Sequence, residues 1–301
     1  MTSNAPLKPN SPTRSATIRP VSAGRLWFRR LLTVVVVVAA LGAGAYAIWQ
    51  RVRPHVLTSP HYQVRLEDVA VTPQPKWIRS DVKAEVVRDA ELNGPLSVLD
   101  EDLARRMHQA FAAHPWVAQV VRVTKLPAAR LQVELLYREP VCMVQVPDGL
   151  FPIDVTGALL PTTDFSPHEA ARYPRFSNAP LPTEPPAGSV WQDERIFAAA
   201  RLAAALSGIW EEMGLRHFEL TSESGSGFDF QLLTKKGTRV FWGPAPAGDE
   251  AGQALAQAKL ARLKQYFLER GALEGPHGAQ DLDLRRGGEI QVVPRTALKP
   301  D

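Results

Sequence analysis

One stretch of the chain is apolar throughout. Leu31 to Trp49 contain no charged side chain, and the strongly polar groups among them are Thr33 and one tyrosine hydroxyl. A helix of these nineteen residues spans about 28 Å at ~1.5 Å per residue, close to the ~30 Å hydrocarbon core of a bilayer. Aromatic side chains stand at both ends, where they favour the membrane interface. The pattern predicts a single transmembrane helix over residues 31–49.

Between residues 60 and 140, segments with period-two alternation flank segments with helical spacing. Ser80 and Asp100 are typical N-cap residues before the two helical segments, and Leu126-Pro127 forms a turn between the last two alternating ones. The predicted elements are a strand over 62–71 with a bulge at 67–68, helices over 81–90 and 101–113, and strands over 117–123 and 130–138. This order predicts a compact α+β unit with a small sheet.

From residue 141 onward, strand and helix patterns again alternate. Seven prolines among residues 161–190 argue against a continuous helix or a central strand there. The predicted elements are a strand and turn over 153–157, a helix over 192–210, strands over 216–220, 227–233 and 238–242, a helix over 253–270 ended by Gly271, and a final hairpin of 281–284 and 289–293. The inward face of the last helix is expected to carry Leu255, Leu260, Leu263 and Phe267. Residues 141–293 are therefore expected to form a mixed-sheet β domain with flanking helices.

Charge is distributed unevenly along the 301 residues. The formal net charge is +4, but residues 1–30 carry six basic residues and no acidic one, so the other 29 basic and 31 acidic residues give a balance of −2. The basic character thus belongs to a tail, and no nucleic-acid-binding domain is implied. The positive-inside rule places this tail in the cytoplasm and the chain after residue 50 outside. Residues 1–30 are expected to be disordered, and residues 294–301 to form a C-terminal tail.

A cleaved secretory signal is the alternative to an uncleaved anchor. Ala43-Gly44-Ala45 and Ala45-Tyr46-Ala47 are cleavage sites of the permitted kind. However, the polar leader is long, and the apolar run exceeds the ~7–15-residue core of a usual signal peptide. The sequence favours the anchor.

The sequence carries no recognisable catalytic or metal-binding signature. Its single cysteine, Cys142, excludes a disulfide framework and is expected to be a small buried hydrophobic residue. The histidines lack the spacing of a zinc helix, and no nucleophile elbow or phosphate-binding loop is present. Asp281 and Asp283 alternate with leucines as in a strand with one polar face, Gly225–Gly227 is expected to be a loop, and His114 is expected at a cap or on the surface. We therefore expect no enzyme activity, no cofactor, no metal and no small-molecule substrate.

Short motifs follow one another in a distinctive order along residues 60–293. They are Pro115-Trp116-Val117, Val121–Pro127, Leu131-Gln132-Val133, Tyr137–Val141, Leu150–Gly157, Tyr173–Phe176, Thr238–Gly243 and Asp281–Gly288. Their order, behind a single anchor, resembles the FtsQ/DivIB family of bacterial cell-division proteins, which have a POTRA domain followed by a β domain. Two places depart from the family pattern: Arg138-Glu139-Pro140 is shortened and inverted, and Arg286 replaces an aromatic residue.

The resemblance implies a non-catalytic scaffold of the divisome in the bacterial inner membrane, with a POTRA-like domain over residues 60–140 and the β domain over 141–293, both outside the cytoplasm. In that family the last sheet edge receives another division protein, so the resemblance implies bitopic partners of the FtsB and FtsL kind. An open edge offers unpaired N–H and C=O groups to an incoming strand. The predicted partner-binding residues are Arg285, Arg286, Glu289, Ile290, Gln291, Val292 and Val293.

A POTRA-containing secretion or outer-membrane assembly factor is the alternative function. Such proteins normally carry a cleaved signal and a barrel of many ~10-residue alternating strands. The chain after residue 141 has too few predicted strands for a barrel. The two functions also differ in the mature N-terminus, because loss of residues 1–47 is expected only for the assembly factor.

Overall fold

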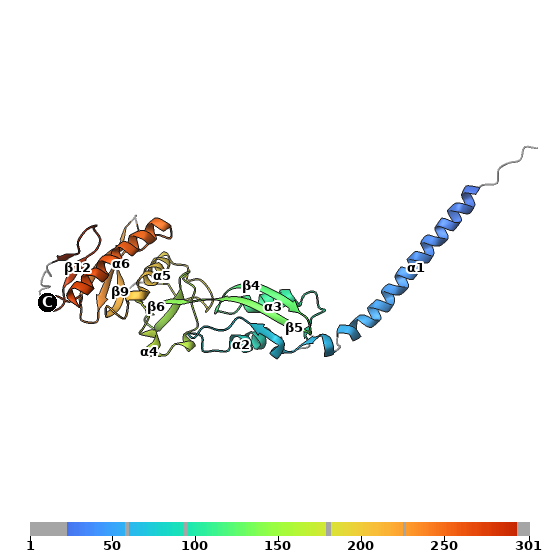
Figure 1. Cartoon of the computed structure of the whole chain (residues 1–301), viewed down its shortest axis with the longest axis horizontal. Coiled ribbons are helices and arrows are strands. Elements are labelled where there is room, and N and C mark those ends of the chain that lie inside the picture. Colours follow the sequence, from blue (N-terminus) through green and yellow to red (C-terminus); the bar gives the residue numbers. More distant parts are fainter. Residues whose placement is uncertain (1–22, 58–59, 93–95, 179–181, 225–226, 294–301) are drawn as a thin grey trace, which may run out of the picture. The chain divides into compact units, whose positions relative to one another are not determined.

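Figure 1 shows the computed structural model, which describes residues 23–57, 60–92, 96–178, 182–224 and 227–293. The chain divides into two compact units, residues 1–59 and 60–301. The first unit holds an apolar helix, and the second is a mixed α+β fold. Residues 1–22 of the predicted N-terminal tail and the predicted C-terminal tail lie outside the described residues.

The apolar segment forms the long helix α1, Ala23–Leu57. Its span Trp27–Val52 contains an 18-residue window with a mean hydropathy of 2.4 and is long and apolar enough to cross a membrane. This helix is longer than the predicted 31–49, and residues 23–30, expected in the disordered tail, are helical instead. Once a helix is nucleated, each further residue adds a hydrogen bond at little cost, so α1 continues past the apolar segment into its flanks.

The first part of the second unit, residues 60–139, contains a three-stranded sheet and is called the three-stranded module here. Its elements are β1 Gln63–Val64, β2 Val69–Val71, α2 Val82–Asp89, β3 Leu96–Ser97, α3 Leu103–Ala112, β4 Val117–Leu126 and β5 Arg130–Tyr137. The sheet order is β2-β5-β4, with β2 parallel and β4 antiparallel to β5. β1 and β3 form a separate two-stranded sheet. Val86 of α2 and Phe111 of α3 share one core with Leu131 and Val133 of β5.

Two details of this module differ from the predictions. A 3₁₀ turn at Leu66–Asp68 replaces the predicted bulge and divides the predicted strand into β1 and β2, which join different sheets. Helix α2 is capped by Asp81 rather than Ser80, because the Asp81 carboxylate accepts the Ala84 N–H at 3.0 Å. Ser80 instead donates to the Asp164 carboxylate from both its backbone and its hydroxyl.

The rest of the described second unit, residues 140–293, contains an eight-stranded mixed sheet and is called the eight-stranded module here (Figure 1). Its strands are β6 Pro140–Val146, β7 Gly149–Asp154, β8 Arg175–Ser177, β9 Leu215–Ser224, β10 Gly227–Thr234, β11 Arg239–Pro244, β12 Asp281–Asp283 and β13 Gln291–Val293. Its α-helices are α4 Pro167–Ala170, α5 Glu194–Leu206 and α6 Glu250–Arg270, with 3₁₀ turns at Thr162–Asp164 and Ser207–Ile209. The strand order is β13-β12-β11-β10-β9-β8-β6-β7.

Alternation along the strands places one face of this sheet against α5 and α6. In β10, Phe230 and Leu232 are buried while their neighbours are partly exposed. They share one core with Ala203 of α5 and Leu263 of α6. Helix α6 ends at Gly271 as predicted, where φ is 72°, a left-handed conformation that glycine adopts without strain.

Two predictions for this module are wrong. Strand β8 lies between β6 and β9, a central position, although it belongs to the proline-rich 161–190 segment. Pro174 directly precedes β8 and the three strand residues include no proline, so the ladder keeps its N–H donors. Leu255 of α6 is 62 % exposed, and Ala256 is buried in its place. The other predicted inward residues are confirmed, because Leu260 and Leu263 are buried and Phe267 packs against the core.

Candidate functional site

The final strand β13 lies at one end of the eight-stranded sheet. It pairs antiparallel with β12, through Val293 with Asp281 and Gln291 with Asp283. Among the residues that the structure describes, no strand lies on its other side. The predicted final hairpin is therefore present, although its second strand begins at Gln291 rather than at residue 289. The outer side of such a strand presents backbone groups to an incoming strand.

All of the predicted partner-binding residues gather at this edge. The exposed ones are Arg285, Arg286, Glu289, Gln291 and Val292, and the half-buried ones are Ile290 and Val293. Val292 is 50 % exposed although it is apolar, and Ile290 packs against the core of the sheet. The edge thus offers an apolar side chain beside its backbone groups.

Two arginines flank the ring of Phe241 next to this edge. The guanidinium carbons of Arg239 and Arg285 lie 5.8 and 5.3 Å from its centroid. Arg239 forms an ion pair with Asp281, and Arg285 forms one with Asp283 at 2.7 Å. The hydrogen bond from Arg285 lowers the pKa of Asp283. Of the predicted partner-binding residues, Arg285 is therefore already engaged within the chain.

Arg262 of α6 fixes the loop that leads into β13. Its Nη1 donates to the carbonyl oxygens of Arg286 and Gly288 at 2.7 and 2.8 Å, and its Nη2 donates to that of Leu284 at 3.2 Å. One guanidinium therefore binds three backbone carbonyls of the loop, because its planar group presents several N–H donors in a fixed geometry. Sequence reasoning missed Arg262, because its acceptors are backbone carbonyls 22 to 26 residues away and carry no side-chain signature.

Replacing Arg262 by alanine is expected to loosen this loop. Backbone amides of residues 284–293 should exchange with deuterium about tenfold faster, because hydrogen bonds to a charged group contribute ~1.5–3 kcal/mol. Lys264→Ala, at an exposed position of the same helix, is the matched control and should leave the exchange unchanged. Equal exchange in the Arg262 variant and the wild type would show that other contacts hold the loop.

Residues Asp154–Gly157 form a turn that is held by the Asp154 carboxylate and by a left-handed glycine. Asp154 Oδ1 accepts the Thr156 N–H at 2.8 Å, and Oδ2 accepts Arg138 Nη1 at 2.6 Å. Gly157 has a φ of 77°, and a Cβ there would lie 3.0 Å from the ring of Phe197. The carboxylate therefore joins the end of β5 to the turn that follows β7.

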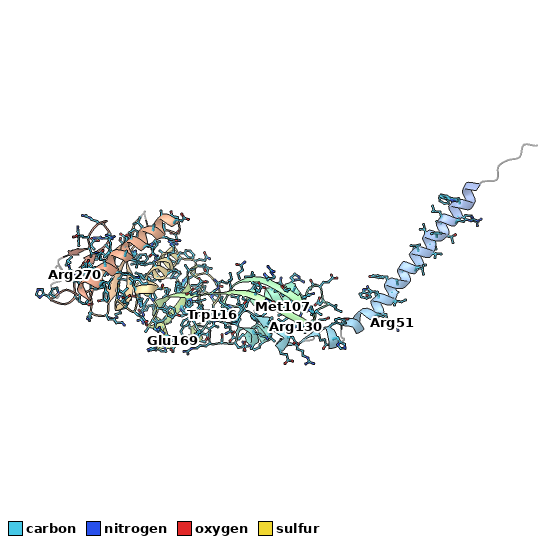
Figure 2. The ribbon with its side chains drawn as sticks, viewed as in Figure 1. Arg51, Met107, Trp116, Arg130, Glu169 and Arg270 are labelled. Atoms are coloured by element: carbon cyan, nitrogen blue, oxygen red, sulfur yellow. The ribbon has the colours of Figure 1, made fainter. Side chains whose placement is uncertain are left out.

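Asp164 links the two modules through a buried hydrogen-bond network. The residue is 4 % exposed, and its carboxylate accepts Trp116 Nε1 at 2.6 Å and the Ser80 N–H at 3.0 Å. Nearby, Glu169 of α4 forms an ion pair with Arg79. Figure 2 shows Trp116 and Glu169 in the same region, where the chain passes from one sheet to the other. A buried network of this kind favours one arrangement of the groups that it joins.

The carboxyl of Glu169 is expected to titrate far below its ordinary value. Hydrogen bonds from Ser166 and, to a smaller extent, from Arg79 lower its pKa to about 2, against ~4.3 for an unperturbed glutamate. Because the folded-state pKa is the lower one, its contribution to stability is present above pH ~4.3 and is lost as the pH falls through about 2. Carbon-detected NMR titration measures the midpoint. Ser166→Ala removes the hydroxyl but keeps the backbone N–H, and Arg79→Ala removes the guanidinium, so each should raise the midpoint part of the way toward the ordinary value. A wild-type midpoint near 4 would contradict this geometry.

The remaining candidate residues take structural positions. Cys142 is buried, as predicted, and burial raises the pKa of its thiol. His114 is buried rather than exposed, because its Nε2 lies 2.9 Å from Glu85 and its Nδ1 accepts the Trp116 N–H. Residues 225–226 of the predicted glycine loop lie outside the described residues. Within the described ranges, no group of three or more His, Cys, Asp or Glu side chains is placed to hold a metal ion.

No protein-family model matches the chain, and no curated protein matches it.

Proposed function

We propose that the chain is a non-catalytic scaffold of the bacterial divisome, held in the inner membrane by α1, that recruits division proteins for septum formation. The open edge of β13 is the observation that carries this proposal. A scaffold of this kind acts by binding alone. Confinement to one membrane raises the effective concentration of its partners, so modest individual contacts suffice.

Helix α1 supports the anchoring role. Its Trp27–Val52 span is apolar enough to cross a membrane, and basic residues concentrate before it. By the positive-inside rule, the N-terminus lies in the cytoplasm and residues 60–301 lie outside it. This topology gives the second unit access to other proteins of the same membrane.

The order of elements in the three-stranded module supports a POTRA-like domain. Helices α2 and α3 precede the β4–β5 hairpin, and β2 completes the sheet beside β5. This order agrees with the motifs by which the sequence resembles the FtsQ/DivIB family. The following mixed sheet with its flanking helices corresponds to the β domain of that resemblance.

The edge of β13 supports bitopic partners of the FtsB and FtsL kind. A strand added beside β13 would bond its backbone groups and cover the exposed Val292. Such augmentation needs only a short extended segment, which a small single-pass protein can supply.

Depletion of the protein in the bacterium that encodes it tests this function. Cells should grow into filaments without septa, and the full-length chain should restore division. Normal septation after depletion would contradict the proposal.

The mature N-terminus separates this function from the assembly-factor alternative. Sequencing of the protein from purified membranes should find residues 1–47 retained. Their loss would favour a secreted assembly factor.

A further inference from the structure

A groove runs along α5 and shares no lining residue with the β13 edge. It consists of three adjoining cavities of about 1230, 740 and 400 Å³. The first and second share Val155 and Ala204, and the second and third share Phe197 and Arg201. Small-molecule sites typically occupy ~300–1,000 Å³. The larger, continuous groove therefore suits a segment of polypeptide.

Aromatic rings and carboxylates meet at one end of the groove. Trp77, Tyr137, Phe165 and Tyr173 line the first cavity together with Glu139 and Glu169, and all four rings are partly exposed. Burial raises the pKa of Tyr173, the charge of Arg172 lowers it, and the charges of Glu139 and Glu169 raise it. Aromatic faces and carboxylates both attract cations.

Acidic side chains outnumber basic ones along the groove. The lining holds eight carboxylates and four basic side chains, which are Lys76, Arg138, Arg172 and Arg201. Arg138 and Arg172 are paired with carboxylates, Arg201 donates to a backbone carbonyl, and Lys76 is exposed. Glu139 and Glu212 are exposed, and neither forms an ion pair within 4.0 Å among the residues that the structure describes. The groove is therefore negative, although the chain as a whole has a formal net charge of +4. Such a surface selects a positively charged partner.

The middle of the groove combines exposed apolar side chains with polar ones, among them Thr156 and Gln253. Val155 is 53 % exposed and lines both larger cavities, and Phe197, Ala204 and Ala205 continue the surface. Exposed apolar area between charged rims is typical of a protein-binding site.

We propose that this groove docks a basic, amphipathic segment of a partner protein. Its apolar side chains would cover Val155 and Phe197, and its lysine or arginine side chains would lie between the aromatic rings and Glu139. This site is independent of the β13 edge and goes beyond the function proposed above. A scaffold with both sites binds two different segments at once.

Fluorescence anisotropy tests the proposal with the full-length chain in nanodiscs of zwitterionic phosphatidylcholine, and binding of the probe to empty nanodiscs is subtracted. The probe is a labelled twelve-residue peptide of alternating lysine and leucine. It should bind saturably, whereas a glutamate–leucine peptide should not bind and a lysine–serine peptide should bind more weakly. The double variant Glu139→Lys/Glu212→Lys should weaken binding of the probe about tenfold or more, equivalent to ~1.4 kcal/mol.

The matched control is Glu101→Lys/Glu269→Lys, which changes the charge equally at exposed positions outside the groove and should leave the affinity unchanged. If the first double variant does not fold, Glu139→Gln and Glu212→Gln singly provide the same test with a smaller effect. Equal binding by wild-type and groove variants, binding of the glutamate–leucine peptide, or no saturable binding of the lysine–leucine peptide would each overturn the proposal.

Discussion

Replacing Trp116 by alanine is expected to lower the free energy of unfolding of the second unit by about 3–5 kcal/mol. The indole is fully buried in the core of the three-stranded module, so its removal leaves a cavity. The substitution also removes the donor that lies 2.6 Å from Asp164, which leaves a buried carboxylate with fewer hydrogen bonds. Denaturant unfolding of the full-length chain, followed by circular dichroism, measures the change.

Two further variants separate the packing of Trp116 from its hydrogen bond. Trp116→Phe keeps an aromatic ring but removes the donor, and it should cost about 1–3 kcal/mol. Leu136→Ala changes a side chain that is 54 % exposed, and it should change stability by less than ~0.5 kcal/mol. A cost for Trp116→Ala no larger than that for Leu136→Ala would show that the indole does not stabilise the module.

Much of the fold follows from local sequence signals, such as composition, alternation and the position of glycines. The apolar run of α1 depends on composition and length, and the end of α6 depends on one glycine in a left-handed conformation. The β12–β13 hairpin follows from alternation on both sides of a glycine pair. Each of these features is determined by residues close together in the chain.

Several of the wrong predictions concern residues whose partners lie far away in sequence. Ser80 resembles an N-cap, but Asp164 accepts its hydrogen bonds and Asp81 caps the helix. His114 is buried, and its Nε2 lies within hydrogen-bond distance of the Glu85 carboxylate. Strand β8 becomes central because it pairs with β6 on one side and with β9 on the other. Local propensity contains no information about such contacts.

The candidate site was predictable only in part, because only some of its features depend on residues close together in the chain. The final strand of a hairpin often ends a sheet, so the place of β13 could be anticipated from its order in the chain. The support that Arg262 gives to its loop and the groove along α5 could not, because both are assembled from residues widely separated in sequence.

Replacing Val292 by lysine is expected to reduce partner binding about tenfold or more. In the free chain Val292 is 50 % exposed, so the longer side chain can keep its ammonium group in water and the fold should remain intact. A strand docked beside β13 would displace water from that ammonium group, which is costly, and a lysine on an edge strand opposes further pairing. Val121→Lys is the matched control, because Val121 is 49 % exposed and lies in β4, an edge strand of the other sheet.

Co-purification is the most direct test of the central claim that the open edge of β13 binds a division partner. The tagged full-length chain is isolated from membranes of its own bacterium, and single-pass proteins of the FtsB and FtsL kind are quantified by mass spectrometry. We predict that the wild type and Val121→Lys retain them, whereas Val292→Lys recovers about tenfold less. Equal recovery by Val292→Lys and the wild type would contradict the claim.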